Sequence, residues 1–346
     1  MGKIMRGQRI GILTAGGDCP GINAAIRGVG KTAIVKYDMK LIGISDGFSG
    51  MINKEYRELT EHDLSGILTL GGTILGTSRE KPFKSSGKGK NEISKPVLIK
   101  EHYEQMCLDC LVCIGGNGTL KTAHLLSQEG LNVVGIPKTI DNDVWGTDLT
   151  FGFDSAVNIA TEAIDRLHST ANSHKRIMII ELMGHNAGWI ALYSGIAGGG
   201  DVILIPEIQY NEDKIAKYLL HRVNDNKAYS IVVVAEGIKN PSKDRSPGQY
   251  LSKRISEMTG LETRETVLGY IQRGGTPSPM DRVLATRYGS AAADMIAECN
   301  YGKMVALKDN KIVSVPLADV SGKLKLVEPN DPLVIQAQNM GTSFGI

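Results

Sequence analysis

Short apolar runs rich in β-branched residues alternate along the chain with longer stretches of helical periodicity. The runs predict strands at residues 9–14, 40–44, 110–114, 131–136, 177–182, 202–205 and 230–235. The periodic stretches predict helices at 22–35, 64–70, 120–128 and 154–167, the last with Ala156, Ile159, Ala163, Ile164 and Leu167 on one face. Because strands that alternate with helices form βαβ units, the pattern predicts an α/β protein with mostly parallel sheet.

The length of the chain changes this picture. At 346 residues it exceeds one doubly wound sheet of ordinary size. We therefore expect two Rossmann-like α/β lobes with mostly parallel sheets and an active-site cleft between them. In such folds ligands bind at the carboxyl ends of the strands, which is where the glycine-rich turns of this chain fall.

Composition and charge exclude several classes of protein. The net charge is +2, which gives no strong field toward nucleic acid or an anionic membrane. No apolar run approaches the roughly 18 residues of a membrane span, and residues 1–9 lack a signal-peptide core. Five cysteines, an odd number, do not indicate a secreted disulfide framework. We therefore expect a cytoplasmic protein that binds neither nucleic acid nor a membrane.

Three glycine-rich turns, at 16–21, 71–77 and 115–119, suggest the chemistry of the ligand. Where Cβ atoms are missing, main-chain N–H groups can approach phosphate oxygens, and a helix N-terminus adds a favourable field. One such turn is as often structural, but three in one α/β chain favour a polyphosphate ligand. The chain has neither a Walker-type P-loop nor the protein-kinase motifs, so any phosphoryl transfer uses another scaffold.

An acidic segment at 137–143 follows a predicted strand. In an extended chain Thr139, Asp141 and Asp143 lie on one face. One carboxylate is then placed to take a proton from an attacking hydroxyl, while the other helps to hold a hydrated Mg²⁺ ion. The alternative is an Asx-type turn with solvated acids.

Several isolated polar residues occupy strand ends or turns. Arg176, His185, Arg264 and Arg273 are candidates for phosphate contact or, alternatively, ordinary surface charges. Glu236 follows the apolar run 231–235, a position that suits accepting a hydrogen bond from a sugar hydroxyl.

Two further segments have structural interpretations. The spacing of Cys107, Cys110 and Cys113 lacks a fourth metal ligand, because Asn117 stands where a cluster requires cysteine, so buried structural thiols are expected. Residues 85–95 are expected to form a solvated surface loop, with Arg79 and Lys84 nearer the structured part and better placed to contact phosphate.

Taken together, six stretches resemble the 6-phosphofructokinase family over nearly the whole chain: 13–23, 71–73, 115–119, 137–143, 181–188 and 268–275. The resemblance implies ATP-dependent phosphorylation of fructose 6-phosphate to fructose 1,6-bisphosphate, with Mg²⁺. It also implies a nucleotide-binding lobe of residues 1–152 and 272–318 and a sugar-phosphate-binding lobe of residues 153–271 and 319–346.

The resemblance also implies roles for individual residues. Asp141 is the general base for the C1 hydroxyl, with Thr139, Gly118 and Lys138 as the other catalytic residues. The nucleotide contacts are Gly17, Arg79, Glu80, Gly115, Gly116, Asn117, Gly118 and Thr119. The sugar-phosphate contacts are Thr139, Ile140, Asp141, Arg176, Met183, Gly184, His185, Glu236, Arg264, Tyr270, Ile271, Gln272 and Arg273. Arg176 and Arg264 match arginines that reach a neighbouring subunit's site, which implies a homotetramer or homodimer.

Four positions depart from the usual family pattern. Asn117 stands where the family usually has an acid associated with magnesium, and an amide is a poorer ligand for a hard cation. The expected metal contacts are therefore weak ones, at Asn117 itself and at Asp143 through water. Lys138 is typical of pyrophosphate-dependent relatives, whereas Gly118 is typical of ATP-dependent ones. This combination resembles the mixed-substrate subgroup, in which ATP is normally the donor. His185 and Tyr270 replace the more usual Arg and His.

Other functions stay open at this point. Lys138 motivates a pyrophosphate-dependent fructose-6-phosphate 1-phosphotransferase. Asn117, His185 and Tyr270 motivate a catalytically weak regulatory subunit that binds sugar phosphate. A lipid or NAD kinase relative shares the glycine turn, but residues 139–143 and 272–275 argue against it.

Overall fold

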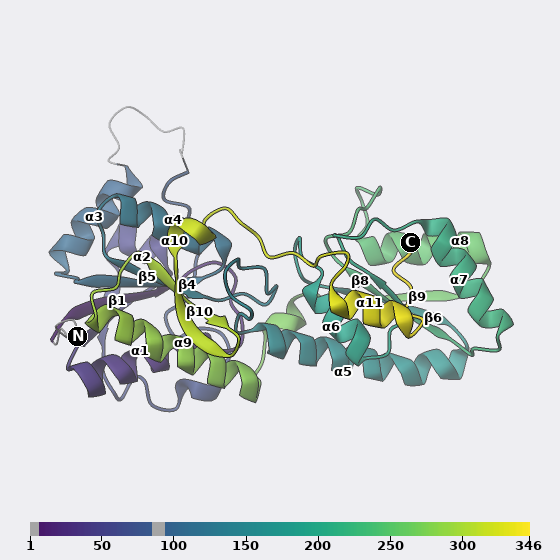
Figure 1. Cartoon of the computed structure of the whole chain (residues 1–346), viewed down its shortest axis with the longest axis horizontal. Helices are drawn as coiled ribbons and strands as arrows, with labels where there is room; N and C mark the ends of the chain where they lie inside the picture. Colours follow the sequence, from purple (N-terminus) through teal and green to yellow (C-terminus); the bar gives the residue numbers. More distant parts are fainter. Residues whose placement is uncertain (1–6, 85–93) are drawn as a thin grey trace. The chain divides into compact units, whose positions relative to one another are not determined.

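The chain folds into two compact units, seen in a computed structural model that describes residues 7–84 and 94–346 (Figure 1). Unit 1 consists of residues 1–139, 144–152 and 273–324, and unit 2 of residues 140–143, 153–272 and 325–346. The short segment Ile140–Asp143 thus belongs to unit 2, although the residues on both sides of it belong to unit 1.

Unit 1 contains a mostly parallel sheet in the order β11-β10-β5-β4-β1-β2-β3. Its strands are β1 (Arg9–Thr14), β2 (Lys40–Ile44), β3 (Tyr56–Leu59), β4 (Cys110–Gly115), β5 (Val133–Pro137), β10 (Lys303–Lys308) and β11 (Lys311–Pro316). Only the edge strands β3 and β11 run antiparallel to their neighbours. Every residue of β4 and β5 is buried, as expected for central parallel strands covered on both faces.

The helices of unit 1 are α1 (Ile22–Tyr37), α2 (Phe48–Asn53), α3 (Lys95–Gln105), α4 (Asn117–Gln128), α9 (Pro279–Ala297) and α10 (Leu317–Val320). Helices α1 and α9 pack against each other at glycines, since a Cβ at Gly28 would lie 2.8 Å from the Thr286 carbonyl oxygen. The prediction of a helix at 64–70 is wrong. Only a 3₁₀ turn at Ile67–Thr69 forms, because Gly66 before it is left-handed and Leu70 after it is extended.

Unit 2 contains a parallel sheet in the order β7-β8-β6-β9. Its strands are β6 (Ile177–Leu182), β7 (Val202–Leu204), β8 (Ser230–Ala235) and β9 (Thr263–Val267). Its helices are α5 (Phe153–His174), α6 (Trp189–Ala197), α7 (Glu212–Asn224), α8 (Pro247–Thr259) and α11 (Pro332–Asn339), and the 3₁₀ helix η2 (Gly269–Arg273) follows β9. The predicted fold class, α/β with two mostly parallel sheets, is confirmed.

The apolar face of α5 differs in part from the predicted one. Ala156 and Ile164 are buried, but Ile159, Ala163 and Leu167 are only partly covered. Ala160 and Ala171 are buried instead, and Ala171 lies beyond the end of the predicted helix.

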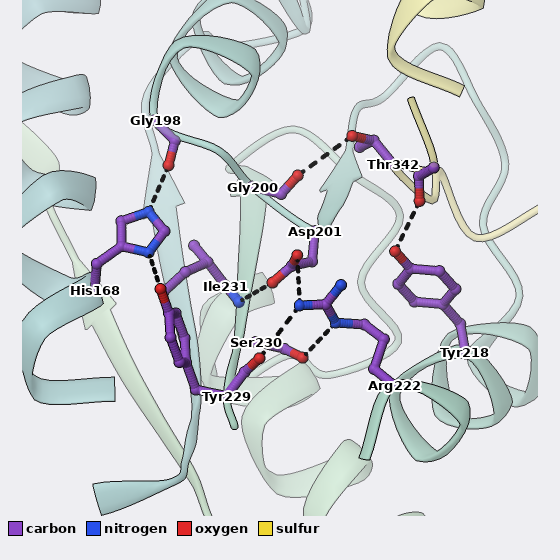
Figure 2. Close-up of polar contacts among 11 residues, drawn as sticks. His168, Gly198, Gly200, Asp201, Tyr218, Arg222, Tyr229, Ser230, Ile231 and Thr342 are labelled. Carbon is purple, nitrogen blue, oxygen red and sulfur yellow. Dashed lines mark hydrogen bonds and ion pairs between the residues drawn. The ribbon is translucent and has the colours of Figure 1, made fainter. Parts of the chain in front are cut away.

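The C-terminal segment is attached to the β7 edge of the unit 2 sheet. Ser343 donates from its N–H to the Asp201 carbonyl, and its own carbonyl accepts from the Ile203 N–H, both at 2.9 Å. Figure 2 shows the polar network beside it, in which Arg222 bridges to Asp201 at 2.7 Å and Tyr218 donates to the Gly341 carbonyl at 2.7 Å. The segment therefore covers a strand edge that would otherwise be open.

Within residues 7–84 and 94–346, no helix combines the length and the apolar character that a membrane span requires.

Candidate functional site

Two glycine turns meet in unit 1 where the strand order reverses. From β1 the chain adds β2 on one side and β4 on the other, so the turns after β1 and β4 lie side by side. Their contact is direct: the Ala15 N–H donates to the Ile114 carbonyl at 3.0 Å, and the Thr119 hydroxyl donates to the Ala15 carbonyl at 3.3 Å. Open α/β sheets bind ligands at this switch point.

The turn after β4 leads directly into helix α4. The first intrahelical bond runs from the Leu120 N–H to the Gly116 carbonyl, so the N–H groups of Asn117, Gly118 and Thr119 belong to the first turn, where anions bind. Packing constrains two glycines of this turn differently. A Cβ at Gly115 would overlap the Thr119 side chain, whereas a Cβ at Gly118 would meet no atom within 4 Å. Packing therefore explains the glycine at 115 but not the one at 118.

Two cationic side chains flank the turn after β1. Lys138 is buried and donates from Nζ to the Gly17 carbonyl, while its own N–H donates to the Gly115 carbonyl at 3.0 Å. Arg273 donates to the Asp18 carbonyl at 3.2 Å, and a Cβ at Gly17 would lie 2.7 Å from its guanidinium. This turn thus carries positive charge suited to a phosphate group.

The second predicted turn, at 71–77, is fixed by one amide side chain. Asn23 donates from Nδ2 to the carbonyls of Leu70 and Gly71 at 3.1 and 3.2 Å, and its Oδ1 accepts from the Ile74 N–H at 2.8 Å. Asn23 is a residue whose role sequence reasoning missed. Its signal was an asparagine among the apolar residues of the first helical turn, where a polar side chain needs a partner.

The structure places Arg79 and Glu80 after this turn in unit 1. Arg79 is exposed, whereas Glu80 forms an ion pair with Lys95 at 2.9 Å and accepts from the Lys81 N–H. Lys84 is exposed. The predicted surface loop at 85–95 lies outside the described residues, apart from its last two positions.

In unit 2 the carboxyl ends of β6, β8 and β9 bring five predicted residues together. The Glu236 Oε1 accepts from the N–H groups of Gly184 and His185, at 3.2 and 2.8 Å. The Met183 N–H donates to Oε1 of Gln272, a fully buried side chain, at 2.8 Å. Glu236 therefore organises the turn after β6, a role not predicted for it.

The other predicted sugar-phosphate residues on this edge face outward. Tyr270 and Ile271 are 73% and 66% exposed. His185 adopts a left-handed conformation with φ of 51°, and a Cβ at Gly237 would overlap its carbonyl oxygen. The turn that carries His185 is thus held in one conformation by backbone contacts.

The prediction that Thr139, Asp141 and Asp143 form one row of an extended chain is wrong. Asn142 between the two acids is left-handed, with φ of 51°, which breaks the alternation of side chains. The alternative of a turn with solvated acids also fails for Asp143, which is only 9% exposed. Asp141 is half-buried.

Arg176 and Arg264 both form ion pairs with one acid, which lies immediately before β9. Arg176 pairs with Glu262 at 2.7 Å and Arg264 pairs with the other oxygen at 2.6 Å. The hydrogen bond from Arg176 lowers the pKa of Glu262. A pocket of about 580 Å³ beside this cluster is also lined by Arg245 and Lys253.

In the part of the chain that the structure describes, no group of three or more His, Cys, Asp or Glu is placed to hold a metal ion. Cys110 and Cys113 are buried as predicted, but Cys107 is exposed. The reason is that Cys107 precedes β4 in a left-handed turn.

Thiol counting checks this arrangement. We expect about two thiols per chain, Cys107 and Cys299, to react rapidly with an aromatic disulfide reagent at pH 8, and five after denaturation. Burial raises the pKa of Cys19 and of Cys113 to about 12, so almost no thiolate exists there in the native state. Rapid labelling of Cys113 in the folded protein, located by mass spectrometry, would contradict the structure.

The turns of unit 1, with their open glycines and flanking cations, fit an α/β protein that binds phosphate groups. The Phosphofructokinase family model matches residues 9–296, and the chain belongs to this family. It is 60% identical over 338 residues to an ATP-dependent 6-phosphofructokinase 3 of Bacteroides thetaiotaomicron, which covers 98% of this chain and 100% of the relative. A pyrophosphate–fructose 6-phosphate 1-phosphotransferase of Amycolatopsis mediterranei is 46% identical, and the match covers 92% of this chain and 96% of that relative.

A solved structure with a similar fold is the T-state phosphofructokinase of Pichia pastoris. It has a TM-score of 0.82 and 33% identity, and the match covers 91% of this chain and 35% of that one.

Proposed function

We propose that this protein phosphorylates D-fructose 6-phosphate to D-fructose 1,6-bisphosphate with ATP, a step of glycolysis. The similarity to ATP-dependent 6-phosphofructokinase 3, over the full length of that relative, supports this reaction. The observation that carries the choice of ATP is Gly118, whose missing side chain leaves open space at the N-terminus of α4. An aspartate there would put bulk and negative charge where a nucleotide's phosphates approach.

In this reaction the protein mainly aligns the two substrates and neutralises phosphate charge. The C1 hydroxyl oxygen attacks the terminal phosphorus of ATP, the bond from that phosphorus to the bridging oxygen breaks, and ADP leaves. Asp141 takes the hydroxyl proton as general base, and Thr139 helps to hold the sugar and the transferred group. Lys138 and Arg273, at the turn after β1, neutralise phosphate charge.

We assign the contacts with each substrate as follows. The nucleotide is held by residues of unit 1: Gly17, Arg79, Glu80 and the turn 115–119. The sugar phosphate is held by Met183, Gly184, His185, Glu236 and the segment after β9, together with Ile140 and Arg273. Exposed Tyr270 and Ile271 are free to contact a ligand without disturbing the core.

Magnesium belongs to this reaction as the ion that accompanies ATP. The described residues contain no cluster of acids for an all-protein site, Asn117 offers an amide, and Asp143 is buried. The residues therefore fit an ion bound mainly by phosphate oxygens and water rather than by the protein.

A donor panel tests the proposed function. Purified protein is assayed for fructose 1,6-bisphosphate with ATP, ADP or pyrophosphate, each with fructose 6-phosphate and Mg²⁺. We expect turnover with ATP and at least about 10²-fold less with pyrophosphate, because Gly118 leaves room for a nucleotide. Preferred use of pyrophosphate would overturn the choice of donor, and binding of the sugar phosphate without any turnover would favour a regulatory subunit.

The second candidate is the pyrophosphate-dependent reaction. It is motivated by the buried Lys138 and by the 46% identity to the Amycolatopsis mediterranei phosphotransferase. The same donor panel separates the two reactions.

We also propose that the protein acts in the cytoplasm as a homodimer or homotetramer. Arg176 and Arg264 reach a neighbouring subunit's sugar-phosphate site, and their clustering at Glu262 on the β9 edge supports a shared surface. A monomeric mass by light scattering at micromolar concentration would contradict the assembly.

A further inference from the structure

Lys325, a residue distant in the sequence, attaches the segment that carries Asp141 to the rest of unit 2. Lys325 donates from Nζ to Oδ1 of Asn142 at 3.0 Å, and its backbone N–H donates to the Asp143 carbonyl at 2.9 Å. Both contacts span more than 180 residues of sequence. Asn142 is 2% exposed and left-handed, so its conformation depends on such partners.

Lys325 is itself held on its other side. Its carbonyl accepts a hydrogen bond from the indole N–H of Trp189 at 2.9 Å, and its ammonium lies 5.5 Å from the centroid of the same ring. Trp189 is the first residue of α6, immediately after the turn that carries His185. A cation over an indole face contributes attraction in addition to the hydrogen bond.

The half-buried carboxylate of Glu207 joins the segment after Lys325 to the same turn. Glu207, just past the end of β7, accepts through Oε1 from the N–H groups of Gly188 and Val327, at 2.9 and 3.0 Å. One oxygen thus joins the residue before α6 to the residue two positions after Lys325. The segment 325–327 is therefore fixed to the carboxyl edge of the unit 2 sheet at two points.

We propose that Lys325 is a positioning residue for the general base. By linking Asn142 and Asp143 to Trp189, it fixes the backbone on one side of Asp141 relative to the turn 183–188, the proposed sugar-phosphate site. The inference rests on the proposed function for the role of Asp141. Because small misplacements of a reacting group cost large factors in rate, the anchor acts on turnover more than on substrate affinity.

The test is Lys325→Met in the full-length protein. Methionine keeps an unbranched stem against Trp189 and leaves both backbone hydrogen bonds of residue 325 possible, but removes the ammonium that reaches Asn142. We expect kcat to fall roughly 10-fold to 10²-fold, with KM for both substrates within about threefold. Amides of residues 140–143 should exchange with deuterium faster, while the rest of unit 2 keeps its protection.

The matched control is Lys323→Met, which removes an exposed lysine two positions away. It should leave kcat and the exchange of 140–143 unchanged. Faster exchange with unaltered kcat in Lys325→Met would overturn the positioning role, and so would an equal loss of kcat in both variants. If the wild-type protein shows no turnover with any donor, the proposed function is wrong, and unchanged exchange at 140–143 in Lys325→Met would independently overturn the anchor.

Discussion

Replacing Asp141 with Asn should lower kcat on the order of 10²-fold or more with both substrates saturating. An amide has nearly the same shape as the carboxylate but accepts no proton from the C1 hydroxyl. Asp141 is half-buried in a segment whose neighbours Asn142 and Asp143 are fixed by Lys325, so the substitution should leave the local backbone in place. Steady-state kinetics of purified variant and wild type make the comparison.

Asp213→Asn is the control for this prediction, since Asp213 is an exposed acid in the first turn of α7. It removes the same charge from the same unit and should leave kcat unchanged. Wild-type turnover in Asp141→Asn would show that another group accepts the proton. A large rise in KM for fructose 6-phosphate with unchanged kcat would show that Asp141 only binds substrate.

Replacing Gly118 with Asp should raise KM for ATP by at least 10-fold and lower kcat/KM for ATP accordingly. The side chain meets no protein atom near its Cβ, so the fold accommodates it. A carboxylate in the first turn of α4 stabilises that helix by about 0.3–1 kcal/mol, because it complements the helix dipole. The variant should therefore bind nucleotide more weakly while unfolding at the same or a slightly higher temperature.

The variant Gly118→Ala separates the effect of side-chain bulk at this position from the effect of negative charge. One methyl group in open space should change KM for ATP by less than about threefold. If Gly118→Asp kept wild-type kcat/KM for ATP, the N-terminus of α4 would not approach the phosphates. A variant that lost stability instead of affinity would show that packing requires the glycine after all.

The sequence predicted the strands of both sheets better than the short helices. Runs such as 110–114 and 230–235 are apolar without interruption because both faces of a parallel strand are covered. Strands β3, β9 and β11 were missed because they are edge strands whose residues are mostly exposed or half-buried, so their patterns lack the buried apolar run. Strand β10 was missed although four of its six residues are buried. The helix at 64–70 failed because a glycine inside the apolar pattern takes a left-handed conformation.

The candidate site was likewise predictable only in its local features. The glycine turns were predictable because a strand followed by glycines and a helix start is a local pattern. The bond between Glu236 and the His185 turn, and that between Lys325 and Asn142, were not, because each joins residues from separate parts of the sequence. The left-handed Asn142 likewise depends on contacts that no local rule contains.

The interleaving of the two units along the chain has a consequence for biosynthesis. Unit 1 is completed by residues 273–324, and unit 2 by residues 325–346. Because synthesis runs from the amino end, unit 1 cannot be completed before residue 324 has been made, nor unit 2 before residue 346. Until residues 279–297 have been made α1 lacks α9, and until Ser343 has been made the β7 edge stays open, so the growing chain exposes an apolar helix face and an unpaired strand edge.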